Sequence, residues 1–125
     1  MANISASFSF VSFNCAGVKN KIQYIHSFCE QADIIFLQET WLMPHEINLL
    51  DNIHSDFNNY SISSVDDGSL LVGRPYGGLS ILYKKSLKVC GNIYSFDDKR
   101  LLGFEIINNN LKYLFINVYL PYFCE

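Results

Sequence analysis

Four polar residues stand at the ends of apolar segments of the sequence. Asn14 follows the first such segment, and Glu39 closes the run D-I-I-F-L-Q-E. Asn117 and Tyr119 lie near the end of the last segment, and their spacing of two places them on one face of a strand. In open α/β sheets, ligands bind outside the carboxyl ends of the strands. These carboxylate, amide and phenol groups are therefore placed to bind a polar ligand at one edge of a sheet.

A sheet must bring these residues together, and the first forty residues predict one. Residues 7–13 read as a strand that ends at Asn14. From 19 to 31, apolar side chains recur every three or four residues, which is typical of a helix with one buried stripe. Residues 33–39 contain the unbroken apolar run I-I-F-L, as expected of a strand that is covered on both faces. A strand, a helix and a strand in this order form a βαβ unit.

The rest of the chain is predicted to be mainly β-structure. Pro44 suits the first turn of a helix, so a second, shorter helix is expected over 45–53. The asparagines at 108–110 tolerate positive φ and indicate a hairpin turn. The loop 66–78 carries G-R-P-Y-G-G, whose final glycine pair is expected to make a tight turn. Strands are expected at 60–65, 79–85, 87–96, 101–107 and 111–120.

The composition is that of a small globular protein without the usual marks of a nucleic-acid-binding module. Of 125 residues, 50% are hydrophobic and 17% are charged, which excludes intrinsic disorder. The net charge of -3 gives no basic footprint, although a bound metal ion can supply the positive charge that a phosphate needs. The N-terminus does not resemble a secretory leader, no apolar run is long enough to cross a membrane, and the four cysteines form no C-x-x-C pair. We therefore expect an intracellular protein with reduced thiols and no membrane partner.

Four motifs give the sequence a resemblance to a known family. F-N-C-A-G at 13–17, D-I-I-F-L-Q-E-T at 33–40, G-R-P-Y-G-G at 73–78 and N-V-Y-L-P at 117–121 resemble, in this order, the endonuclease/exonuclease/phosphatase family. That family includes the apurinic-site endonucleases and the deoxyribonuclease-I-like enzymes. The last two motifs are most similar to the endonuclease domains of non-LTR retrotransposons. The resemblance implies the N-terminal half of a four-layer α/β sandwich, a mixed sheet with two helices, from a Mg²⁺-dependent phosphodiester hydrolase.

The same resemblance implies roles for the polar residues. Glu39 matches a metal-binding glutamate, and one well-placed carboxylate is adequate as a first ligand for Mg²⁺, or for Mn²⁺ in its place. Among the catalytic groups, Asn14 matches an asparagine that orients the metal and the phosphate oxygens, and Tyr119 matches a tyrosine that hydrogen-bonds the scissile phosphate. Asn117 and Arg74 are further candidates for substrate binding.

Most of these residues also have a purely structural interpretation. Asn14 can simply terminate a strand, and Tyr119 is equally compatible with packing at the rim of the core. Asn117 fits a buried asparagine that hydrogen-bonds neighbouring backbone, and Arg74 fits a solvated loop residue. The functional interpretation is strongest for Glu39.

The histidines predict no second site. His26 lies on the polar side of the predicted helix and His45 follows Pro44, and neither has a partner at metal-ligand spacing. His54 precedes Ser55-Asp56, but this order is the reverse of the S-D-H motif of the family, so we interpret it as a coincidence.

The sequence departs from the family pattern in ways that bear on activity. Residues 1–125 correspond to a partial domain, because the later D-x-N and S-D-H motifs, which supply the activating aspartate and the histidine, have no match. General-base activation typically contributes about 10²–10⁴-fold, so the chain alone is expected to be nearly inactive. We also expect it to supply mainly one of two facing sheets, whose exposed apolar inner face would favour self-association.

The sequence therefore predicts a fragment of a Mg²⁺-dependent phosphodiesterase, a nucleic-acid endonuclease of retrotransposon type. Nucleic acid, with DNA first, is the expected partner of the complete domain, while the choice between DNA and RNA stays open; the nucleus is the expected location if the retroelement interpretation holds. A phosphatase of the same fold, acting on a small or lipid phosphate ester, is one alternative. A non-catalytic α/β remnant or binding module that keeps only the shape is the other.

Overall fold

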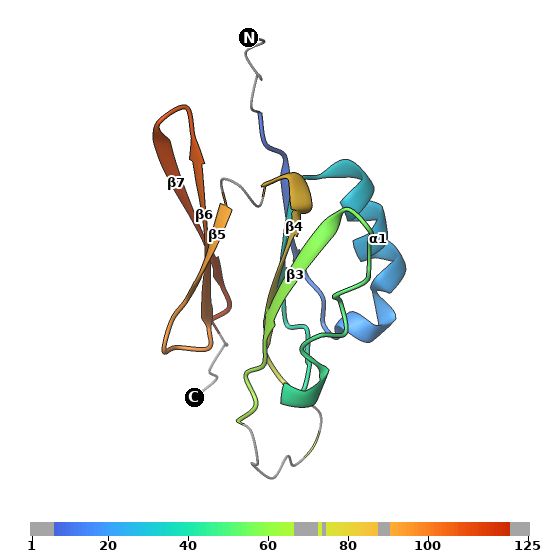
Figure 1. Ribbon diagram of the computed structural model, residues 1–125. Coiled ribbons are helices and arrows are strands. Elements are labelled where there is room, and N and C mark those ends of the chain that lie inside the picture. Colours follow the sequence, from blue (N-terminus) through green and yellow to red (C-terminus); the bar gives the residue numbers. More distant parts are fainter. Residues whose placement is uncertain (1–6, 67–72, 74, 88–90, 121–125) are drawn as a thin grey trace.

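A computed structural model shows two β-sheets packed face to face, with an α-helix on the outside of the first sheet (Figure 1). It describes residues 7–66, 73, 75–87 and 91–120. The strands are β1 (Phe10–Asn14), β2 (Ile34–Gln38), β3 (Phe57–Ile62), β4 (Leu79–Lys84), β5 (Gly91–Ser95), β6 (Leu101–Asn108) and β7 (Leu111–Val118). Within the described residues, α1 (Ile22–Gln31) is the only α-helix, and short 3-10 turns occupy Val18–Asn20, Pro44–Glu46 and Lys85–Leu87. The first sheet has the order β1-β2-β4-β3 and the second β5-β6-β7.

The βαβ unit predicted at the N-terminus is present. β1 and β2 are parallel neighbours, and Asn14 pairs with Gln38 at their carboxyl ends. α1 connects them and buries Ile25 and Cys29 against the first sheet. β4 is antiparallel to both β2 and β3, so the sheet is mixed, as predicted.

β2 is buried on both faces, as its unbroken apolar run predicted. Ile35 and Leu37 belong to the core between α1 and the first sheet. Ile34 and Phe36 point the other way, into the core between the two sheets. Full burial of an aliphatic or aromatic side chain contributes about 1.5–3 kcal/mol. β2 therefore ties the helix layer and both sheets into one structure.

The prediction of a second helix over 45–53 is wrong. Pro44 starts a turn as expected, but the backbone N–H groups of Leu49 and Asp51 bond to the carbonyl three residues earlier, which is the 3-10 pattern. The carboxylate of Asp51 accepts a hydrogen bond of 2.9 Å from Nδ2 of Asn59 in β3. This bond to the neighbouring strand holds the segment in short turns instead of a continuous helix.

The bounds of several strands differ from the prediction, and β1, expected at 7–13, begins only at Phe10. The strand expected at 60–65 is β3, which begins and ends three residues earlier, because its ladder with β4 runs from the Phe57–Lys84 pair to the Ile62–Leu79 pair. The strand expected at 87–96 is the shorter β5, Gly91–Ser95, and a 3-10 turn ends at Leu87 before it.

The hairpin predicted at 108–110 is confirmed. Asn109 and Asn110 have φ values of 52° and 64°, and positive φ at both central residues is the requirement of a type I′ turn. The turn joins β6 and β7 in antiparallel register, with Asn108 paired to Leu111.

The inner faces of the two sheets cover each other, which corrects the expectation that an inner face would be exposed. Leu102, Phe104 and Ile106 of β6 pack into the core between the sheets. Five of the exposed apolar side chains lie on the outer face of the second sheet, which no described helix covers (Figure 1). They are Tyr94, Ile107, Leu114, Ile116 and Val118, each between 38% and 55% exposed. Among the described residues, no helix is long and apolar enough to cross a bilayer.

Asn117 ties the two sheets together. Its side chain is 2% exposed, and Nδ2 donates to the carbonyls of Leu37 and Ser80, each at 3.0 Å. Its Oδ1 accepts from Nε2 of Gln38 at 2.7 Å. Because both amide hydrogens are used inside the protein, the geometry favours the buried, structural interpretation of Asn117 over substrate binding.

Removing this tie should destabilise the protein. Asn117→Ala would remove three hydrogen bonds from the buried space between the sheets, to the carbonyls of Leu37 and Ser80 and from the amide of Gln38, so we expect the free energy of unfolding to fall by about 2–4 kcal/mol. The control is Asn92→Ala, an exposed asparagine of β5, which should change it by less than about 0.5 kcal/mol. Urea denaturation followed by circular dichroism measures both, and equal small effects would contradict the role of Asn117.

Candidate functional site

The carboxyl ends of β1 and β2 lie side by side and carry the first two predicted site residues. Their pairing places Asn14 opposite Gln38, one residue before Glu39. The two chain segments stay together past the strands, since the N–H of Gly17 donates to the carbonyl of Glu39 at 2.9 Å. Asn14 is exposed, and its Oδ1 accepts from the N–H of Ala16 at 3.1 Å, which holds the amide at the end of the strand.

Glu39 contacts Tyr119 from the other sheet. Tyr119 follows β7, and its hydroxyl donates to Oε1 of Glu39 at 3.1 Å across 80 positions of sequence. The backbone N–H of Tyr119 donates to the carbonyl of Arg100 at 3.1 Å, which fixes the residue where β7 ends. A carboxylate that accepts one hydrogen bond from a phenol still has lone pairs for a cation. This contact therefore brings a metal-binding type of group and a hydrogen-bond donor to one place.

The chain around Glu39 has a strained backbone. Glu39 has a φ of 52°, and Ala16 and Trp41 beside it have values of 44° and 60°. A residue other than glycine in this region costs roughly 1–3 kcal/mol, and it persists only when the surrounding structure holds it there. Such residues concentrate at functional sites, so the strain is independent support for a site at the end of β2.

Gly77 and Gly78 provide part of that surrounding structure. The N–H groups of Thr40 and Trp41 donate to the carbonyls of Gly78 and Gly77 at 3.2 and 2.8 Å. Gly78 has a φ of 93°, and a Cβ added to it would lie 2.3 Å from Oγ1 of Thr40. The tight turn predicted for this glycine pair is not found, because the backbone at 75–78 forms no turn; the positive φ values and the close approach to the chain after Glu39 are what require glycine here.

The thiol next to Asn14 is buried in the core between α1 and the first sheet. Burial raises the pKa of Cys15 to about 12, with a smaller opposing effect of Lys21. The group is therefore a neutral thiol near pH 7, whereas cysteine binds metals as the thiolate. The groups that remain at this edge are oxygen ligands and amides, which suit a hard cation.

Three of the five site residues predicted from the sequence lie at the same end of the two sheets. These are Asn14, Glu39 and Tyr119. Asn117 is buried between the sheets. Arg74 lies outside the described residues.

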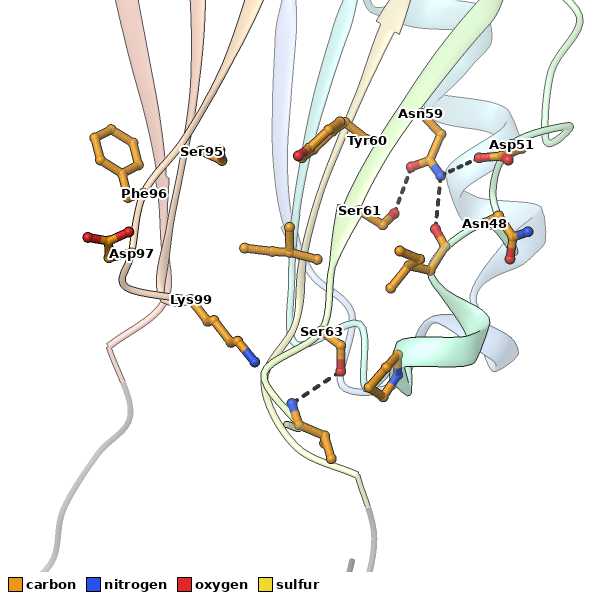
Figure 2. Close-up of a pocket in the computed structure, with 14 residues that line it drawn as sticks. Asn48, Asp51, Asn59, Tyr60, Ser61, Ser63, Ser95, Phe96, Asp97 and Lys99 are labelled. Atoms are coloured by element: carbon orange, nitrogen blue, oxygen red, sulfur yellow. Dashed lines mark hydrogen bonds between the residues drawn. The ribbon is translucent and has the colours of Figure 1, made fainter. Parts of the chain in front are cut away.

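A hollow of about 700 Å³ elsewhere in the molecule includes none of these residues. It lies between β3 and the turn after β5, beside the 3-10 turn at Pro44–Glu46 (Figure 2). Polar side chains of its lining hydrogen-bond to one another (Figure 2). Nδ2 of Asn59 donates to Asp51, and the hydroxyl of Ser61 donates to Oδ1 of Asn59 at 2.7 Å. We therefore interpret this hollow as a gap between edge strands and not as the site.

The sequence itself places the chain in a family. Residues 11–121 match the family model described as the Endonuclease/Exonuclease/phosphatase family. The chain belongs to this family. A search of curated proteins found no match.

Solved structures agree on the fold. The AP endonuclease LMAP from Leishmania major superposes with a TM-score of 0.65 and 18% identity, over 91% of this chain and 40% of that one. For the APE2 catalytic domain from Xenopus laevis the TM-score is 0.59 with 21% identity, over 91% and 45%. For the 3′ phosphatase NExo from Neisseria, bound to a product DNA hairpin, it is 0.55 with 11% identity, over 86% and 40%. The chain thus has the deoxyribonuclease-I-like fold, and it spans less than half the length of each of these proteins.

Sequence reasoning missed the residues that support the site. Gln38 donates both to Ser12 at 3.1 Å and to Asn117, which links the site edge to the second sheet. The positive φ of Glu39 could not be predicted from the sequence, because glutamate does not favour that conformation. The glycine pair predicted a turn, but no local pattern in the sequence indicated that these glycines contact Thr40.

Replacing Gly78 should test this support. Gly78→Ala combines positive φ with the contact to Thr40, so we expect the free energy of unfolding to fall by about 2–4 kcal/mol. Gly73→Ala is a matched control, because Gly73 has a similar φ of 88° and its added Cβ meets nothing within 4 Å. It should cost only about 1–2 kcal/mol. Chemical denaturation of both variants separates the contributions, and equal losses would argue against the Thr40 contact.

Proposed function

We propose that the chain carries part of the active site of a divalent-metal-dependent phosphodiesterase that acts on nucleic acid. The observation that carries the proposal is the 3.1 Å hydrogen bond from Tyr119 to Glu39, with Asn14 on the strand beside Glu39. A carboxylate and a phenol are thus in contact, and a carboxamide lies at the end of the neighbouring strand. This set suits a hard cation and the oxygens of a phosphate.

Each residue has a distinct part in this proposal. Glu39 would hold Mg²⁺, or Mn²⁺ in its place, and the ion would supply Lewis-acid polarisation of a phosphoryl oxygen. Tyr119 would turn its hydroxyl hydrogen from Glu39 to a phosphate oxygen of the substrate. The Oδ1 of Asn14 is already held by Ala16, which leaves its amide N–H groups to donate to an anionic oxygen and orient it.

We propose DNA as the substrate. One structural neighbour, LMAP, is named as an AP endonuclease, and the third, NExo, was solved with a DNA hairpin. The likeness of G-R-P-Y-G-G and N-V-Y-L-P to retrotransposon endonucleases supports a retroelement enzyme that works in the nucleus. Because the third neighbour is named as a 3′ phosphatase, a phosphate monoester is the second candidate substrate.

We also propose that activity requires more polypeptide than these residues supply. The chain spans 40% to 45% of the length of its structural neighbours. β1 and β7 are edge strands, each with a free side for further strands, and the outer face of β7 exposes Leu114, Ile116 and Val118. The rest of a complete domain would cover this face and supply the general base. Self-association of the chain through the same face is the alternative.

Magnesium binding is the first test. Addition of Mg²⁺ to millimolar concentration, followed by NMR, should shift the backbone resonances around Asn14 and Glu39. Glu39→Gln should remove these shifts, because the amide lacks the negative charge that a hard cation needs. Glu30→Gln, an exposed glutamate of α1, should keep them. Shifts that are absent at millimolar metal, or unchanged in Glu39→Gln, would contradict the proposed metal site.

A chimera tests the catalytic assignment. Fusing the chain to the C-terminal half of an AP endonuclease of the family supplies the D-x-N and S-D-H motifs, and we expect the product to nick supercoiled plasmid DNA. Glu39→Gln in the chimera should reduce nicking by roughly 10²-fold or more. A folded chimera that releases phosphate from a 3′-phosphorylated oligonucleotide without nicking would favour the second candidate. One with neither activity would overturn the proposal.

A further inference from the structure

A cluster of ligating side chains lies on elements that carry none of the proposed active-site residues. His26 and Glu30 are four residues apart on α1, a spacing that places them on the same face of the helix. His54 comes from the turn that leads into β3. Candidate ligand atoms of the three side chains all lie within 4.8 Å of one another. The cluster supplies partners for His26 that its spacing in the sequence did not indicate.

The contacts within the cluster hold the side chains in place. Nε2 of His54 lies 3.0 Å from Oε1 of Glu30, and the rings of His26 and His54 have centroids 5.2 Å apart. The His54 side chain is only 12% exposed, and its ring packs edge-on against the buried Phe57 at 5.4 Å. The backbone N–H of Asp56 donates to Nδ1 of His54 at 3.0 Å. His54 is therefore a fixed ligand, while Glu30 and His26 are exposed and free to adjust.

We propose that His26, Glu30 and His54 form a binding site for a borderline divalent transition-metal ion, with Zn²⁺ as the ion of reference. Two imidazoles and one carboxylate are a ligand set that zinc accepts, with water in the fourth position. Ligand atoms of a tetrahedral zinc site lie about 3.3 Å apart, given metal–ligand distances of about 2.0–2.1 Å. The separation within this cluster is close enough for rotations of the exposed side chains to reach that geometry.

His54 must change its tautomer when a metal ion binds. Because Nδ1 accepts from Asp56, the ring proton is on Nε2, where it is donated to Glu30. A neutral imidazole that ligates a metal through Nε2 must carry its proton on Nδ1. Metal binding would therefore break the hydrogen bond from the Asp56 N–H, which is exposed and can turn to water. The cost of this step predicts moderate affinity, in the micromolar range.

The site differs in chemistry from the edge at Glu39. Imidazole nitrogen favours zinc, copper and nickel over magnesium, whereas the Glu39 edge offers oxygen ligands. An ion bound by the cluster would join α1 to the turn before β3 and so fasten the helix layer to the edge of the first sheet. The proposal therefore concerns stability, and it does not depend on the proposed phosphodiesterase activity.

Zinc titration of the full chain is the test. The protein carries Cys90→Ser and Cys124→Ser in every sample, because thiols also bind zinc and these two lie outside the described residues. Isothermal titration should give one Zn²⁺ per chain, with an increase in Tm on binding. His26→Ala and Glu30→Gln, both at exposed positions, should each weaken binding at least about tenfold, which corresponds to about 1.4 kcal/mol. The NMR amide resonance of Asp56 should shift as the metal binds.

Two matched variants make the result specific. His45→Ala removes an exposed histidine of the Pro44–Glu46 turn and should bind zinc like the parent protein. Glu39→Gln should also bind zinc normally, although it loses the response to magnesium. Zinc affinity that is the same in His26→Ala, Glu30→Gln and His45→Ala would overturn the proposal. So would a titration to millimolar zinc in which the Asp56 resonance does not move.

Discussion

The burial of β2 on both of its faces is the constraint on which the rest of the structure depends. A strand with no polar face cannot lie at a surface, so it needs α1 on one side and the second sheet on the other. The helix returns the chain so that β1 lies parallel to β2, which aligns Asn14 with the end of β2. The second sheet brings Tyr119 to Glu39. The elements that cover the apolar strand β2 are therefore also the ones that bring the residues of the candidate site together.

Local patterns predicted the elements in which one period dominates. The I-I-F-L run, the apolar stripe of α1 and the asparagine turn between β6 and β7 all have the structure expected of them. The helix predicted over 45–53 was wrong because Asp51 is bonded to Asn59 of β3. A bond between residues distant in sequence has no local signature. The exposed face was wrongly assigned for the same reason. β6 and β7 carry apolar side chains on both faces, so their sequences do not show which face meets another sheet.

The site itself was predicted in part, from strand ends and from a family resemblance. Position on a strand predicted that Asn14 and Glu39 share an edge, and the parallel register agrees. The strained φ of Glu39 and the close approach of Gly78 to Thr40 could not be predicted, since both depend on how separate segments pack. The cluster of His26, Glu30 and His54 was missed on similar grounds, because its third member lies 24 residues beyond the second.

The hydrogen bond from Tyr119 to Glu39 also has a consequence for biosynthesis. β1, α1 and β2 follow one another directly, so they can associate early, while Tyr119 lies after the last described strand. Contacts between residues distant in sequence form slowly, because the entropy of closing the intervening loop is lost before the contact compensates for it. During translation Glu39 would leave the ribosome long before its phenol partner is made. The contact that joins the two sheets at the candidate site therefore cannot form until Tyr119 has been synthesised.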